Sequence, residues 1–130
     1  MKTFLIDTNA ILRFLLNDVA SQYRLVKIKI NEAKKGKFVL VVPEIIFFES
    51  YFTLTSYYQY SKEKVLEALG SLISSAYFEI ENRNILLKAL KIYKSTNLSL
   101  VDSYLAARSE MSDVEVFTFD KKLDKYAKNS

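Results

Sequence analysis

Hydrophobic residues along the chain form short continuous runs separated by longer segments with helical spacing. Each run holds four or five largely apolar residues, many of them β-branched or aromatic, which is typical of strands that are buried in a sheet. The runs lie at residues 3–6, 38–42, 77–80 and 115–119. This pattern predicts four short strands.

Between these runs, apolar positions recur every three or four residues, which is the period of an amphipathic helix. Asp7-Thr8-Asn9 is typical of a helix cap, Pro43 of a helix start and Gly36 of a helix end. Helices are therefore expected from the first cap to residue 17, at residues 19–35, 43–58, 61–75, 83–95 and 100–111, and after Asp120.

Strands that alternate with single or paired helices predict an α/β fold with a parallel sheet covered by helices. The 130 residues are 50% hydrophobic and include only two glycines and one proline, which leaves little room for flexible linkers. A single domain spanning residues 1–130 is expected. In such folds, ligands bind where strands end and the following helices begin.

Two residue types are absent from the sequence, and their absence narrows the possible chemistry. Without cysteine there are no disulfides, thiol nucleophiles or cysteine–zinc sites. Without histidine there is no Ser-His-Asp relay, no histidine acid–base pair and no common zinc-hydrolase ligand set. A hydrolase with this sequence must use carboxylates, hydroxyls, lysines or arginines, or a metal ion that these groups hold.

The net charge is +4 and the isoelectric point is near 9.2, which favours binding to polyanions. The first apolar run is interrupted by Asp7, Asn9 and Arg13, so it is too short for a secretory leader. No segment approaches the roughly 18 apolar residues of a membrane helix. A cytoplasmic protein without a membrane span is expected, and the lack of cysteine suits a reducing compartment.

Four acidic residues lie at positions where they could form an active site. Asp7 and Asp120 follow the first and last predicted strands, so a parallel sheet would bring both to the same edge. Asp102 lies in the first turn of a predicted helix, and Glu49 lies in a helix between apolar neighbours. Such a cluster suits Mg²⁺, which prefers oxygen ligands and activates water for attack on a phosphodiester.

Each of these acids also has a structural interpretation. Asp7 and Asp120 are suitable N-caps, and Asp102 fits a capping box with Ser99. Glu49 is either a carboxylate buried at a considerable cost in free energy or one that tilts towards solvent. A capping carboxylate can also face a metal ion, so the two interpretations are compatible.

Further polar residues near these acids are candidates for supporting roles. Asn9 and Thr118 could hold Asp7 and Asp120 in position, although either could be an ordinary cap or strand residue. Residues expected near the same edge that could bind a polyanionic substrate are Arg13, Lys121 and Lys122. The aromatic segment 57–60 could stack on unpaired bases, pack a helix end or line a dimer contact.

Four segments, in this order, resemble the PIN domain. They are Ile6-Asp7-Thr8-Asn9, a helical Glu49 after Pro43, Val101-Asp102 with Leu105-Ala106-Ala107, and Thr118-Phe119-Asp120. Their order and spacing are similar to those of VapC-type toxins, and the resemblance covers essentially the whole chain.

The resemblance implies a three-layer α/β/α sandwich with a short, mainly parallel central sheet. It implies a Mg²⁺- or Mn²⁺-dependent endoribonuclease, the toxin of a type II toxin–antitoxin pair, with RNA as substrate, a cognate antitoxin as partner and a homodimeric state. The family's catalytic and metal-binding acids fall on Asp7, Glu49, Asp102 and Asp120.

One departure from the family pattern leaves the number of metal ions open. Many members carry another acid shortly after the last aspartate, whereas Lys121 and Lys122 stand there in this sequence. Asp124, one turn further on, either replaces that acid in part or is a solvated surface residue.

Two other functions compete with the nuclease hypothesis. A non-catalytic RNA-binding or protein-interaction module would keep the fold and the basic charge without turnover. A phosphatase on a similar parallel sheet is disfavoured, because Asp7-Thr8-Asn9 lacks the paired aspartates of haloacid-dehalogenase-like enzymes.

Overall fold

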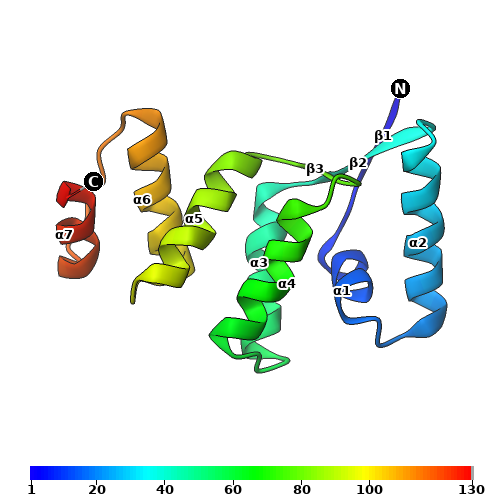
Figure 1. Cartoon of the computed structure of the whole chain (residues 1–130), viewed down its shortest axis with the longest axis horizontal. Coiled ribbons are helices and arrows are strands. Elements are labelled where there is room, and N and C mark those ends of the chain that lie inside the picture. Colours follow the sequence, from blue (N-terminus) through cyan, green and yellow to red (C-terminus); the bar gives the residue numbers. More distant parts are fainter. Residues whose placement is uncertain (130) are drawn as a thin grey trace. The chain divides into compact units, whose positions relative to one another are not determined.

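The computed structural model describes residues 1–129, which form two compact units divided after Glu81. The first unit, Met1–Glu81, contains the whole sheet and four helices, and the second, from Asn82 onward, contains helices (Figure 1). Helices combined with a purely parallel sheet confirm the α/β class and agree with the expected α/β/α sandwich.

The sheet of the first unit has the order β1-β2-β3, and both strand pairs are parallel. Its strands are β1 (Lys2–Leu5), β2 (Phe38–Val42) and β3 (Glu79–Ile80). The backbone pairing continues past the strand ends, because the Ile6 amide donates to the Val41 carbonyl at 2.9 Å and the Glu81 amide to the Val42 carbonyl at 3.1 Å. The carboxyl ends of all three strands therefore lie along one edge, where helices begin.

The helices of the first unit are α1 (Thr8–Leu16), α2 (Ala20–Lys34), α3 (Glu44–Ser56) and α4 (Lys62–Ser74). Local signals set their ends. The Asp7 side chain caps α1, the Ser61 side chain caps α4, and Gly36 takes a φ of +79° just after α2, where a side chain would be strained. α1 packs against α2 and α3, and α3 packs against α4.

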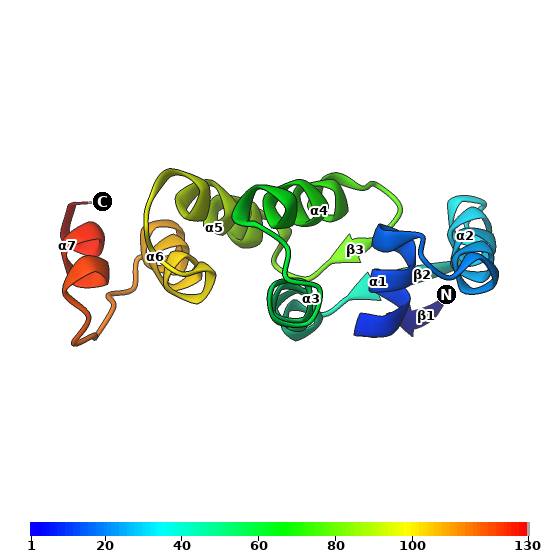
Figure 2. The same ribbon diagram turned by 90° about the horizontal axis from the view of Figure 1, so that it is seen from below.

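The second unit is formed by α5 (Arg83–Ser95), α6 (Leu100–Ser112) and α7 (Lys121–Asn129). α5 and α6 lie side by side in both views, and α7 packs on α6 (Figures 1 and 2). Their shared core consists of Ala89, Ile92, Leu98, Ala106, Ala107 and Leu123. Small alanines on α5 and α6 allow the two helices to approach closely, and Leu123 is the contribution of α7 to this core.

The sequence predicted the helices and the first three strands closely, and the fourth strand is wrong. Residues 114–119 form no regular secondary structure, and the Phe117 and Phe119 side chains are 88% and 92% exposed. A strand requires a neighbour that accepts its backbone hydrogen bonds, and β propensity alone does not supply one. Among the described residues, no strand pairs with this segment.

Within residues 1–129, no helix has both the length and the apolar character needed to cross a membrane.

The Leu123 side chain is only 1% exposed, so truncating it tests how strongly α7 is held in the second unit. We expect Leu123→Ala to lower the free energy of unfolding by about 2 to 5 kcal/mol, because it leaves a cavity in the core. Leu87→Ala is the matched control, since Leu87 is a helical leucine that is 38% exposed. Urea denaturation measures both changes, and equal effects would contradict the assigned core.

Candidate active site

Asp7 lies where β1 gives way to α1. Its backbone is extended (φ −87°, ψ 174°), and its Oδ1 accepts a hydrogen bond from the Ala10 amide at 2.9 Å, which is the N-cap interaction of α1. The Oδ2 atom makes no hydrogen bond or ion pair with the described residues, and the residue is exposed. Asp7 is therefore a helix cap that keeps one carboxylate oxygen available for another ligand.

Glu49 approaches the same place from α3. The Thr8 hydroxyl donates a hydrogen bond to Glu49 Oε1, and Thr8 is the first residue of α1, next to Asp7. Thr8 is only 8% exposed, whereas Glu49 itself is exposed. Of the two interpretations of Glu49, the tilt towards solvent is the one observed. The contact brings two carboxylates from different elements to the start of α1.

Asp102 belongs to the second unit and lies in the first turn of α6. Its backbone amide donates to the Ser99 hydroxyl at 3.1 Å, so Ser99 is the N-cap of α6. The reciprocal bond of a capping box, from the Ser99 amide to the Asp102 carboxylate, is absent from the described residues. The Asp102 carboxylate is half-buried and is not needed to cap the helix.

Asp120 occupies the corresponding position at the start of α7. Its Oδ1 accepts a hydrogen bond from the Leu123 amide at 2.9 Å, and its own amide donates to the Thr118 hydroxyl at 3.0 Å. Thr118 thus contacts the backbone of Asp120. Like Asp7, Asp120 is an exposed cap that uses one oxygen for the helix and has a second oxygen that can bind elsewhere.

The four predicted acids are divided between the two units. The first unit holds Asp7 and Glu49 near each other, and the second holds Asp102 and Asp120. Neither unit, as far as its residues are described, contains a group of three or more acidic side chains that could hold a metal ion. The gathering of all four into one site stays a prediction.

The hydrogen bond from the Thr8 hydroxyl to Glu49 is a contact of this site that the sequence did not indicate. Asn9 was expected to support Asp7, yet Asn9 is exposed and no hydrogen bond of its side chain is found in the described part of the chain. Thr8 is buried and orients Glu49 instead. No signal in the sequence could have paired these two residues, because they lie on different helices far apart in the chain.

The three predicted substrate-binding cations differ in their surroundings. Arg13 Nη2 donates to the Tyr58 hydroxyl at 3.0 Å, and Arg13 Nε lies 3.2 Å from Asp18 Oδ1 without hydrogen-bond geometry. Arg13 is therefore a link between α1 and the residues that follow α3. Lys121 and Lys122 are exposed in the first turn of α7, directly after Asp120.

The donor set at the start of α1 suits a hard divalent cation. Carboxylate oxygens are the protein ligands that Mg²⁺ and Mn²⁺ prefer, and Mg²⁺ usually takes only one or two of them together with water and substrate phosphate. Asp7 and Glu49 supply two exposed carboxylates, and the Thr8 hydroxyl fixes the orientation of one of them. The residues therefore fit such an ion.

Sequence comparisons relate the chain to a known family. The sequence profile of the PIN domain matches residues 4–129. The chain is 22% identical over 122 residues to a VapC ribonuclease of Aquifex aeolicus (strain VF5), a similarity that covers 93% of this chain and 90% of the relative. No solved structure matches the chain. Because the profile match covers nearly the whole sequence, the protein belongs to the PIN domain family.

Proposed function

We propose that this protein is a divalent-metal-dependent endoribonuclease in which Asp7, Glu49, Asp102 and Asp120 are the acids that bind the metal ion. The observation that carries the proposal is the Thr8–Glu49 contact, which brings two acids to the carboxyl end of β1. Further support comes from the family membership and from the similarity to a VapC ribonuclease.

A Mg²⁺ or Mn²⁺ ion held by these acids would supply an activated water molecule and neutralise charge on the scissile phosphate. The chain itself does the positioning. Helix capping fixes Asp7 and Asp120, so each presents one carboxylate oxygen with little loss of side-chain entropy. The Thr8 hydroxyl holds Glu49 in one orientation. Lys121 and Lys122 place positive charge beside Asp120, where an RNA phosphate would need it.

The biological setting proposed is that of a type II toxin, acting on RNA in the cytoplasm and neutralised by a cognate antitoxin protein, with a homodimer as the working form. This part rests on the similarity to the VapC ribonuclease over most of both chains. Co-purification of the antitoxin and the mass of the complex in solution would test it. The competing function is a PIN-fold module that binds RNA without cleaving it.

The proposal predicts that RNA cleavage requires a divalent ion and Asp7. Purified protein is incubated with a structured RNA and Mg²⁺ or Mn²⁺, with EDTA, and as Asp7→Asn. We expect cleavage only for the wild-type protein with metal, because asparagine caps a helix as well as aspartate does but lacks the negative charge.

Glu63→Gln is the matched control, since Glu63 is an exposed acid in the first turn of α4. It should leave cleavage unchanged and cost only the small stabilisation that a first-turn acid gains from the helix dipole. Cleavage that survives both EDTA and Asp7→Asn would exclude a metal-dependent mechanism. RNA binding without turnover at any metal concentration would favour the non-catalytic module.

Thr8→Val removes the hydroxyl that orients Glu49 while keeping the size of the buried side chain. We expect the metal concentration needed for half-maximal activity to rise about 10- to 100-fold, which is typical when a group that orients a metal ligand is removed. The measurement is a metal titration of the cleavage rate.

Thr53→Val is the control for this change, because the Thr53 hydroxyl also bonds Glu49 but through its backbone carbonyl, at 2.9 Å. It should leave the metal requirement unchanged. If Thr8→Val and Thr53→Val behave alike, Thr8 has only a structural role.

The proposal also predicts a gain in stability when one acid is neutralised. If four carboxylates share one cavity, they repel each other without metal, so Asp102→Asn should raise the melting temperature of the metal-free protein while abolishing cleavage. Differential scanning fluorimetry with EDTA measures the first effect. A lower melting temperature with cleavage retained would mean that Asp102 only interacts with the dipole of α6.

A further inference from the structure

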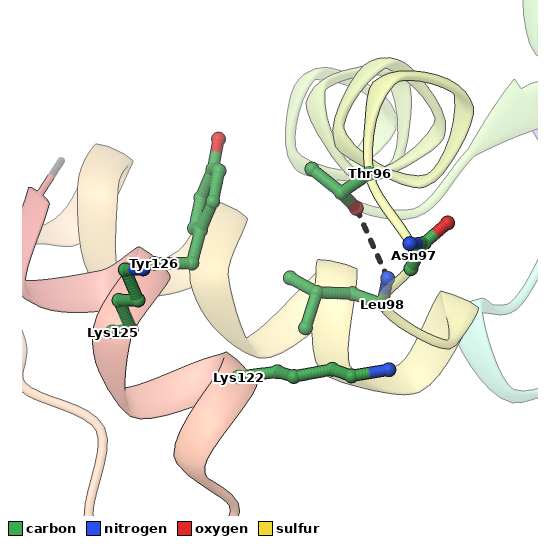
Figure 3. A pocket seen from close by; sticks show the side chains of 6 residues that line it. All are labelled: Thr96, Asn97, Leu98, Lys122, Lys125 and Tyr126. Atoms are coloured by element: carbon green, nitrogen blue, oxygen red, sulfur yellow. Dashed lines mark hydrogen bonds between the residues drawn. The ribbon is translucent and has the colours of Figure 1, made fainter.

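The second unit contains a pocket of which the proposed function uses only one residue, Lys122. It has a volume of about 360 Å³, which lies at the lower end of the range for small-molecule sites. It lies between α7 and the connection from α5 to α6 (Figure 3). The residues that line it are Thr96, Asn97, Leu98, Lys122, Lys125 and Tyr126.

One side of this pocket is a single face of α7. Lys122, Lys125 and Tyr126 stand at positions i, i+3 and i+4, which are neighbours on a helix surface. Figure 3 shows Lys122 extending from α7 below Leu98, whereas the Tyr126 ring points upward beside α7 in this view. Leu123, on the adjacent face, is buried in the core and fixes the rotation of the helix. The face of α7 from which these side chains project is therefore fixed.

The opposite side is a short turn held by local hydrogen bonds. The Thr96 hydroxyl donates to the Ile92 carbonyl at 2.7 Å and accepts from the Leu98 amide at 3.2 Å (Figure 3). Leu98 is only 6% exposed and belongs to the same core as Leu123. The turn and α7 are thus anchored to one core, which holds the backbone of the two sides of the pocket together.

The chemistry of the lining suits a nucleotide of a single strand. Lys122 and Lys125 are exposed ammonium groups that can contact phosphate, and Tyr126 offers a ring on which a base can stack. Asn97 carries an exposed amide that can hydrogen-bond the edge of a base. Among the described residues that line the pocket none is acidic, so nothing there repels a phosphate.

The pocket is also close in the chain to Asp120, one of the two proposed metal ligands of this unit. Asp120 caps α7 through the Leu123 amide, and Lys122 lies in the same first turn. A helix rises 1.5 Å and turns by about 100° per residue, so Lys122 is about 3 Å along the axis from Asp120 and about 200° around it, and Tyr126 is about one turn further. An RNA strand whose scissile phosphate is near Asp120 would therefore have to cross the start of α7 to place a flanking nucleotide beside this face.

We propose that the pocket lined by Lys122, Lys125, Tyr126 and Asn97 binds one nucleotide of a single-stranded RNA, next to the phosphate that is cleaved. The pocket would hold the RNA in register by one stacked base and its phosphates, without contributing to the cleavage chemistry. This inference rests on the proposed nuclease function for its biological meaning, whereas its test measures binding alone.

The test is the affinity of a fluorescently labelled single-stranded decauridylate RNA, measured by anisotropy in EDTA so that no cleavage occurs. We expect Lys122→Gln and Lys125→Gln each to weaken binding. Each should also reduce the slope of log affinity against log salt by about 0.7 for every phosphate that the lysine neutralises in the wild-type protein. Tyr126→Leu should weaken binding about 5- to 100-fold because the base no longer stacks on a ring, and Tyr126→Phe should retain it.

Lys91→Gln is the matched control, because Lys91 is an exposed lysine of α5 in the same unit and does not line the pocket. Because this substitution removes only a charge outside the pocket, it should lower the affinity and the salt slope much less than the pocket substitutions do. The lysine substitutions are at exposed positions, so a loss of folding would not explain their effect. Tyr126 packs against the core of the second unit, so an unchanged melting temperature of Tyr126→Leu is needed to assign its effect to the lost base contact.

The outcomes separate this inference from the proposed function. RNA binding that is equally affected by the pocket variants and by Lys91→Gln would overturn the pocket assignment while leaving the nuclease proposal intact. Selective weakening in the pocket variants, together with a wild-type protein that never cleaves RNA with metal, would support the pocket and overturn the nuclease. No binding of the oligonucleotide by the wild-type protein would overturn the inference.

Discussion

The change from β1 to α1 at Asp7 is the constraint on which the first half of the candidate site depends. A parallel strand ends at the edge of the sheet, and the next helix must begin there with backbone amides that lack partners. The Asp7 carboxylate satisfies one of these amides and so is fixed at the edge. The following residue, Thr8, is buried and turns its hydroxyl to Glu49. The interaction that caps α1 therefore also positions the side chains of the candidate site.

The second unit shows the same kind of arrangement at the start of α7. Asp120 caps the helix with one oxygen, Thr118 holds the Asp120 amide, and Leu123 anchors the first turn in the core. A single turn of helix therefore fixes a carboxylate and directs the lysine and tyrosine face that lines the pocket. The Asp120 carboxylate is followed directly by two lysines. This arrangement offers a ligand for a metal ion next to ammonium groups that can contact a phosphate.

Helix positions were predictable because their signals are local. Ser61 and Ser99 each accept a hydrogen bond from the amide three residues on, and Gly36 ends α2 by its backbone conformation. Such interactions involve only a few neighbouring residues, so the sequence contains all that is needed to find them. The positions of Asp7 and Asp120 at the starts of helices followed from the same reasoning.

The sequence by itself therefore determined the α/β class, the helices, the first three strands and the two capping aspartates of this PIN domain protein. Only the tertiary structure decided that Thr8, rather than Asn9, supports an acid, and that Glu49 faces solvent. It also decided that residues 114–119 form no strand. These features depend on partners that are distant in the chain, and neither side-chain pairing across helices nor a strand's hydrogen-bonding neighbour is encoded in local propensity.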